Sequence, residues 1–145
     1  MEKVTIILNK EQAHSVMAAL ELYSRVHMGQ FDNLDWEFVT HGVNRDFWRD
    51  QGKRDELRSL LNRAKQIIFP ELVQNSYQGI CSTKIPNSAR DAWDLYQSLR
   101  HKLSWYNNPN PDDMSRWSNS YSEPFKTSTE HKVPVVTVEK VEEDV

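Results

Sequence analysis

Cysteine and glycine are scarce in this sequence, and long apolar runs are missing. The single cysteine, Cys81, excludes an intramolecular disulfide, and the five histidines lack the paired spacing of a zinc site. Only four glycines are present, and they form no phosphate-cradling loop. No apolar run approaches the roughly 20 residues of a membrane span, and no charged, apolar leader precedes the first strand-like residues. We therefore expect a cytoplasmic protein with no metal and no cofactor.

The net charge is also small, at −3, because 18 basic and 21 acidic side chains nearly balance. This balance provides no overall attraction to nucleic acid, although a local basic face is compatible with it. The length of 145 residues suits one domain, which buries roughly two-thirds of the surface of its unfolded chain. A hydrophobic core of useful size is therefore expected.

The N-terminal segment predicts a strand followed at once by a helix. Residues 4–8 (VTIIL) form a short segment rich in β-branched side chains, which is typical of a strand. Asn9 and Gln12 form a capping-box pair that starts a helix, and Gly29 supplies its stop. The inner face of this helix is expected to carry Ala13, Val16, Leu20, Tyr23 and His27.

Two further amphipathic helices are predicted. Leucines and isoleucines between residues 57 and 68 mark one of them, which Pro70 limits. The other begins near Pro86 to Ser88, with Ser88 and Asp91 as a capping pair, and runs to about Tyr106. Its buried stripe is expected to consist of Ala92, Leu95, Tyr96, Leu99, Leu103 and Tyr106.

The C-terminal part predicts an extended arm. Residues 107–132 are rich in Asn, Pro, Ser and Asp, and residues 133–138 (VPVVTV) suit an edge strand that pairs with residues 4–8. The expected fold is therefore α+β and predominantly helical, with about three main helices, a short terminal β-sheet and the arm. Residues 1–106 are expected to form the helical core domain, and residues 107–145 to pack on it.

Aromatic, Arg and Gln side chains interleave in two of the predicted helices, a mixture suited to stacking a planar ligand and binding its rim. In the last helix Trp93, Gln97 and Arg100 share one flank, and Arg100 follows Tyr96 by four residues. Near Gly29, the first helix ends with groups that a ligand can reach. The predicted ligand-binding residues are Tyr23, Arg25, Gln30, Trp93, Gln97, Arg100 and Trp105.

Both of these groups of residues can also be explained by packing alone. Trp93 and Tyr96 can complete the core while Arg100 extends over them into water, and Arg25 can be a solvated side chain beside an ordinary helix C-cap. His27 on the inner face of its helix suits a packed, hydrogen-bonded histidine better than a metal ligand. The spacing of the residues does not decide between packing and a pocket.

Candidate catalytic groups are sparse. Asp112, Glu130 and Lys132 fit loosely the pattern of a metal-dependent nuclease, but Asp112 falls in a turn rich in Pro and Asn. Asp94 and His101 share a helix face about 10 Å apart along the axis, which is too far for a catalytic dyad. A non-catalytic protein is therefore expected.

Several motifs resemble small uncharacterised proteins of tailed phages and prophages. They span most of the chain: LYSR at residues 22–25 with GQF at 29–31, YQSLRHKLSW at 96–105 and EPFKTS at 123–128. The resemblance implies a phage origin and, by analogy, a counter-defence role. On that basis we expect a protein that sequesters a nucleotide-derived signalling molecule, acting as at least a dimer.

The alternative is an inhibitor that binds a host protein. Its possible interface anchors are five aromatic side chains, Trp36, Phe47, Trp48, Trp105 and Trp117. The acidic C-terminal end and the extended arm would then reach the partner.

Overall fold

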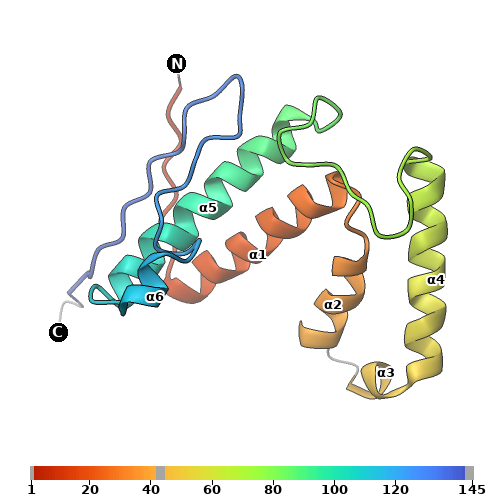
Figure 1. Ribbon diagram of the computed structural model, residues 1–145. Helices are drawn as coiled ribbons and strands as arrows, with labels where there is room; N and C mark the ends of the chain where they lie inside the picture. The colour runs from red at the N-terminus through yellow and green to blue at the C-terminus, as the bar shows by residue number, and fades with distance from the viewer. Residues whose placement is uncertain (1, 42–44, 143–145) are drawn as a thin grey trace. The chain divides into compact units, whose positions relative to one another are not determined.

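The computed structural model describes residues 2–41 and 45–142, which are helical and irregular in conformation (Figure 1). The helices are α1 (Lys10–His27), α2 (Asp32–His41), α3 (Arg45–Arg49), α4 (Gln51–Ile68), α5 (Asn87–Asn107) and α6 (Asp113–Arg116). None of the described helices combines the length and the apolarity that crossing a membrane requires.

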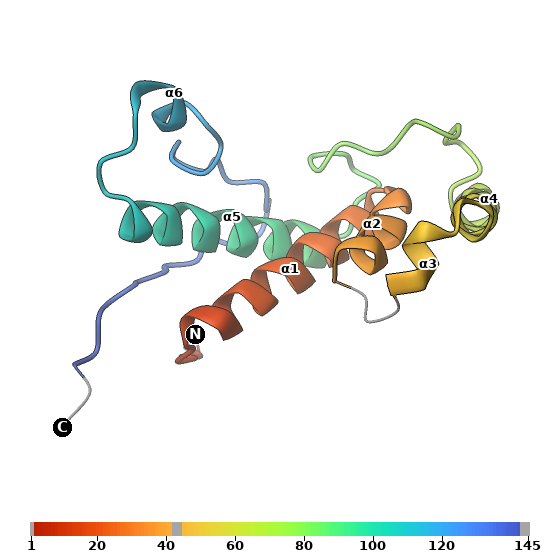
Figure 2. The ribbon, with the colours of Figure 1, turned by 90° about the horizontal axis from the view of Figure 1, so that it is seen from below.

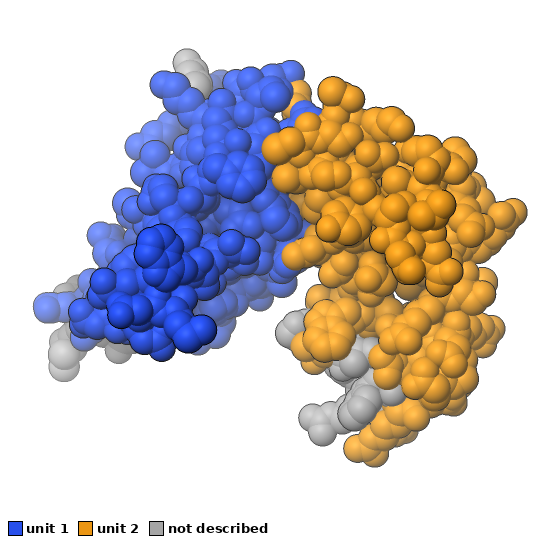
Figure 3. Space-filling model, viewed as in Figure 1, with its two compact units in different colours: residues 1–21, 90–145 blue, residues 22–89 orange. Residues whose placement is uncertain are grey.

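The chain divides into two compact units (Figure 3). Unit 1 comprises residues 1–21 and 90–145, and unit 2 comprises residues 22–89. Helices α1 and α5 each contribute to both units, so the division falls inside helices.

Unit 1 is organised by the start of α1 and by most of α5. The predicted capping box is confirmed, because the Asn9 N–H donates to Gln12 Oε1 (3.0 Å) and the Gln12 N–H donates to Asn9 Oδ1 (2.8 Å). Its buried apolar side chains are Ala13, Ala92, Tyr96 and Leu103. This core is small, and hydrogen bonds to α5 supplement it.

The chain after α6 turns back across α5 (Figures 1 and 2). Asp94, buried on α5, accepts hydrogen bonds from Thr127 Oγ1 (2.6 Å), the Thr127 N–H (2.8 Å) and the Ser128 N–H (3.0 Å). His101 Nε2 lies 3.2 Å from Glu123 Oε2. The EPFKTS segment is thereby attached to α5 at both its ends.

Unit 2 depends on a sharp turn at Gly29, where the predicted helix stop is confirmed. Gly29 has φ +82°, a left-handed conformation that glycine adopts at little cost. A Cβ atom there would lie 2.7 Å from Leu72 Cδ1, so a side chain would require Leu72 to shift. The turn is flanked by the buried Met28 and Phe31. It leads the chain directly from α1 into α2.

The predicted terminal β-sheet is wrong, and the fold is helical instead of α+β. No strand occurs among residues 2–41 and 45–142. Residues 4–8 are exposed, with Ile7 at 91%, and Val135 is 93% exposed. A two-stranded ribbon is marginal in water unless an apolar face is covered, and in the described part of the chain residues 4–8 are exposed throughout.

The three long predicted helices are present as α1, α4 and α5, whereas three short helices were missed. Helices α2 and α3 lie between the first two predicted helices, where no helix was predicted, and α6 lies in the predicted arm. The predicted cap at Ser88 is also wrong, because α5 begins at Asn87 and Ser88 Oγ pairs with Tyr23 Oη at 3.0 Å. Tyr106, expected in the buried stripe, is 46% exposed.

Candidate functional site

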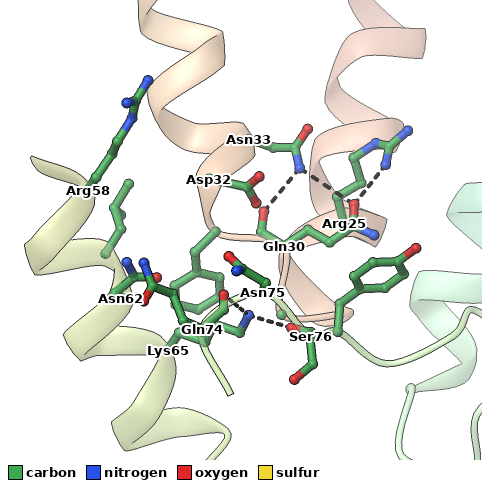
Figure 4. Close-up of a pocket in the computed structure, with 14 residues that line it drawn as sticks. Arg25, Gln30, Asp32, Asn33, Arg58, Asn62, Lys65, Gln74, Asn75 and Ser76 are labelled. Atoms are coloured by element: carbon green, nitrogen blue, oxygen red, sulfur yellow. Dashed lines mark hydrogen bonds between the residues drawn. The ribbon is translucent and has the colours of Figure 1, made fainter. Parts of the chain in front are cut away.

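A pocket of about 540 Å³ lies entirely within unit 2 (Figure 4). Its wall is formed by the end of α1, the turn at Gly29, the start of α2, one face of α4 and residues 74–77. The volume falls in the range of roughly 300–1,000 Å³ that small-molecule sites occupy. Three separate stretches of chain, residues 25–33, 58–65 and 74–77, therefore converge on one hollow.

The turn at Gly29 positions the first polar group of the pocket. Arg25 Nη1 donates a 2.7 Å hydrogen bond to Gln30 Oε1, and Asn33 Nδ2 donates to the Gln30 backbone oxygen at 3.2 Å. Figure 4 shows these three side chains together at the junction of α1 and α2. The Arg25 guanidinium is held there in a defined position.

The opposite wall is held by Lys65, a lysine that is only 5% exposed. Its ammonium donates to the backbone oxygens of Gln74 (3.0 Å) and Ser76. Buried lysines need such partners because an unpaired buried charge is costly. Lys65 thus fastens residues 74–76 to α4 and places their side chains at the pocket.

Carboxamides dominate the polar lining. They are Gln30, Asn33, Asn62, Gln74 and Asn75. Within the described part of the chain, no hydrogen bond engages the side-chain amides of Asn62, Gln74 or Asn75. Each unused amide offers two donors and an acceptor, the combination that reads the edge of a heterocycle. The pocket therefore presents recognition groups that its own structure does not consume.

The electrostatics of the lining favour an anion. The lining contains three cationic side chains, those of Arg25, Arg58 and Lys65, and one carboxylate, that of Asp32. Asp35 lies nearby, and its Oδ2 accepts a 3.0 Å bond from Arg58 Nε, so part of the charge of Arg58 is balanced. A positive balance remains at the pocket.

Phe31 and Tyr77 contribute aromatic rings to the lining. Phe31 is buried and meets Phe69 edge to face, with ring centroids 6.0 Å apart. Tyr77 lines the same pocket and is 58% exposed, so its ring is available for contact. Rings beside amides and cations suit a ligand that is flat as well as charged.

Of the seven predicted binding residues, Arg25 and Gln30 line this pocket. Tyr23 belongs to unit 2 but not to the lining; its hydroxyl pairs with Ser88, and its ring is tilted against that of His27 with centroids 4.6 Å apart. Trp93, Gln97, Arg100 and Trp105 belong to unit 1. The structure therefore does not gather the predicted set into one site.

Arg100 is engaged by its own neighbours. Its guanidinium carbon lies 5.1 Å from the centre of the Tyr96 ring, and its Nη1 donates to Tyr96 Oη at 3.3 Å. Its Nη2 donates to Gln97 Oε1 and, at 3.4 Å, to the Asn119 backbone oxygen. This arrangement corresponds to the packing interpretation, in which Arg100 covers an aromatic side chain.

The two tryptophans of the predicted set also contact their own unit. Trp93 is half-buried with its ring 5.4 Å from that of Tyr96, and Trp105 Nε1 donates to the Tyr121 backbone oxygen at 3.0 Å. Trp105 and Tyr121 also meet edge to face, with centroids 5.1 Å apart. Both rings help to hold α5 together with the residues around it.

Sequence reasoning missed most of the pocket lining. Asn62, Gln74 and Asn75 carry no spacing signal, because they come from α4 and from an irregular segment. One available signal was Lys65, which falls among Leu61, Ala64 and Ile68 in an amphipathic helix. A charged residue at such a position needs partners, and those partners line the pocket.

The groups considered for catalysis are placed elsewhere. Asp112 caps α6 through a 2.7 Å bond from the Ser115 N–H to its Oδ1, and this bond lowers the pKa of Asp112. Among the described residues, no three His, Cys, Asp or Glu side chains are grouped closely enough to hold a metal ion. Cys81 is an exposed free thiol outside the pocket lining.

No family model matches this chain, and no curated protein and no solved structure is significantly similar to it.

Proposed function

We propose that this protein is a non-catalytic binding protein that holds a small, planar anion of the nucleotide class in the unit 2 pocket. The observation that carries the proposal is the convergence of Arg25, Arg58 and Lys65 with five carboxamides around about 540 Å³. A nucleotide combines a phosphate for the cations with a base for the amides. The fixed position of Arg25 on Gln30 supports charge-assisted binding of the phosphate.

The lining favours binding over chemistry. Its side chains are amides, cations, hydroxyls, aromatic and apolar groups and a single carboxylate, Asp32, which has no described histidine or cysteine beside it in the lining. General acid–base catalysis requires a positioned proton donor and acceptor, and nucleophilic catalysis requires an activated nucleophile. The pocket residues are better suited to retaining a ligand than to transforming it.

The phage-like motifs suggest a biological setting for such binding. A small phage protein that retains a nucleotide-derived signal removes it from the host without needing an enzymatic step. We propose this sequestering role as the use of the pocket, with the resemblance of residues 22–31 and 96–105 as its support. The signal itself is identified only as a nucleotide-like anion.

The proposal is tested by native mass spectrometry of protein purified from host cells, followed by calorimetric titration of ligand-free protein. The titrants are adenosine, AMP, GMP, UMP, cyclic AMP and inorganic phosphate. We expect at least one nucleotide to bind at least tenfold more tightly than both adenosine and phosphate, since a charge-assisted pair contributes about 1.5–3 kcal/mol. Absence of a retained small molecule together with no binding of any nucleotide would contradict the proposal.

A matched pair of variants locates the site. Asn75→Ala removes an unused pocket amide, whereas Asn119→Ala removes an amide of unit 1. We expect the first variant to weaken nucleotide binding about threefold to tenfold, and the second to leave it unchanged. Equal losses in the two variants would place the binding site outside the pocket.

The second candidate function, an inhibitor that binds a host protein, has its own support. Three apolar side chains in the C-terminal part of unit 1 are widely exposed, Met114 at 88%, Trp117 at 86% and Phe125 at 70%. Trp, Met and Phe are enriched at protein interfaces. Trp36 is also exposed, Phe47 and Trp105 are half-buried, and the side chain of Trp48 lies outside the described residues. Stable co-purification of one host protein, lost on Trp117→Ala, would favour this function.

A further inference from the structure

The two terminal segments of unit 1 have sequences typical of strands but do not form a sheet in the described part of the chain. Residues 2–8 and 133–140 have no regular secondary structure, and neither segment makes a backbone hydrogen bond to another residue that the structure describes. Both are rich in β-branched residues, which favour strands. Exposed backbone of this composition is a template for pairing with another chain.

Burial along residues 133–139 alternates with a period of two. Pro134, Val136 and Val138 are half-buried, whereas Val135 and Thr137 between them are exposed. This alternation is typical of an extended segment with one face against the protein. The even-numbered side chains therefore form an inner face, to which a neighbouring strand would add its own apolar side chains.

One antiparallel register matches residues 2–8 to this segment in both charge and face. The opposed pairs are Glu2–Lys140, Lys3–Glu139, Val4–Val138, Thr5–Thr137, Ile6–Val136, Ile7–Val135 and Leu8–Pro134. Opposite charges meet at one end of the ladder, and a threonine pair and β-branched pairs follow, all of which stabilise cross-strand contacts.

The same register also places apolar side chains on the inner face and puts the proline at a tolerated position. It adds Val4, Ile6 and Leu8 to the side that already carries Val136 and Val138. Pro134, which has no N–H to donate, then lies at the end of the ladder, where it is tolerated. A shift by two residues in one direction opposes Glu2 to Glu142, and a shift in the other direction removes both charge pairs. A shift by one residue turns the apolar side chains outward.

We infer that residues 2–8 of one copy pair with residues 133–140 of a second copy. Within the single chain these segments belong to the same unit and do not pair, so the complementary partner is supplied by another molecule of the same sequence. Reciprocal exchange between two copies gives a closed, two-fold symmetric dimer with two such ribbons. The inference is independent of the pocket and of its ligand.

Charge exchange tests the pairing. Lys3→Glu opposes two acids in both ribbons, so the dimer dissociation constant measured by sedimentation equilibrium is expected to rise about tenfold. Glu139→Lys is expected to have a similar effect. The double variant, Lys3→Glu with Glu139→Lys, is expected to restore the dissociation constant to within about threefold of the original value. Lys10→Glu, the same charge change outside the ladder, is the control and should leave the constant unchanged. A monomeric original protein, or a dimer that the double exchange does not restore, would overturn the inference.

Cross-linking distinguishes the two possible origins of the partner strand. In a Cys81→Ser background, Ile6→Cys and Val136→Cys form a directly opposed pair that is within reach of a disulfide. Oxidation should give a covalent dimer on a non-reducing gel. An internally cross-linked monomer, or no cross-link at all, would contradict pairing between copies.

Discussion

Unit 1 and unit 2 use the same kinds of side chain in opposite ways. Around α5, Arg100 bonds Gln97 and lies over Tyr96, so the arginine, the amide and the ring engage one another. At the end of α1, Arg25 bonds Gln30, but beside them lies a hollow whose lining includes three amides without a described partner, those of Asn62, Gln74 and Asn75. Arginine, glutamine and aromatic side chains therefore mark a binding site only where their donors and acceptors outnumber the contacts that the fold provides.

The largest expected effect tests whether the polar groups of unit 1 are structural. Asp94→Ala removes the acceptor of three hydrogen bonds and leaves the buried Thr127 and Ser128 backbone N–H groups unpaired. We expect it to lower the free energy of unfolding by about 3–5 kcal/mol, because each unsatisfied buried donor costs about 1–3 kcal/mol. Denaturant unfolding measures the loss.

Asp91→Ala is the matched control for this prediction. Asp91 lies on the same helix and pairs with His131 at 2.8 Å, but the two side chains are 37% and 63% exposed. An exposed pair contributes about 0–1 kcal/mol, so this variant should be nearly as stable as the original. Equal losses in the Asp91 and Asp94 variants would show that the EPFKTS segment is not held through Asp94.

A smaller loss is expected at the turn that builds the pocket. Gly29→Ala places a Cβ atom 2.7 Å from Leu72 Cδ1 at φ +82°, and we expect a loss of about 2 kcal/mol from the two effects together. Nucleotide binding should also weaken, because Gln30 follows the turn directly. Gly52→Ala, in the first turn of α4 where the Cβ has room, should be neutral or stabilising by up to about 1 kcal/mol.

The outcome at Gly29 also depends on Leu72. Leu72→Ala removes the clashing atom, so Gly29→Ala should cost less in that background than in the original protein. A cost that is the same in both backgrounds would assign the whole effect to the left-handed backbone.

The smallest expected effect concerns pH. The Ser115 backbone N–H lowers the pKa of Asp112 below its ordinary value of 3.8. A lowered folded-state pKa means that the cap contributes fully above pH 3.8 and is lost as the pH falls through the lower folded-state value. The protection factor of the Ser115 amide, which is its exchange rate relative to the intrinsic rate at the same pH, should therefore fall only in that acidic range, and Asp112→Asn should remove this pH dependence. A loss of protection near neutral pH would contradict the assignment.

Local signals in the sequence predicted local structure well. The Asn9 and Gln12 capping box, the stop at Gly29 and the three long helices depend on neighbouring residues, and all are present. The prediction of a terminal sheet was wrong because strand pairing depends on distant partners and on the covering of an apolar face. Arg25 and Gln30 were identified as site residues because they flank the turn, whereas Asn62 and Asn75 were missed because only the fold brings them to the pocket.

The most direct test compares one arginine from each unit. Arg25→Gln and Arg100→Gln are titrated calorimetrically with the nucleotide that binds the original protein most tightly in the panel above. We predict that Arg25→Gln weakens binding at least tenfold, since it removes a charge-assisted contact worth about 1.5–3 kcal/mol, and that Arg100→Gln changes it by less than about twofold. A large loss in the Arg100 variant with no loss in the Arg25 variant would contradict the account, because it would place the ligand on α5.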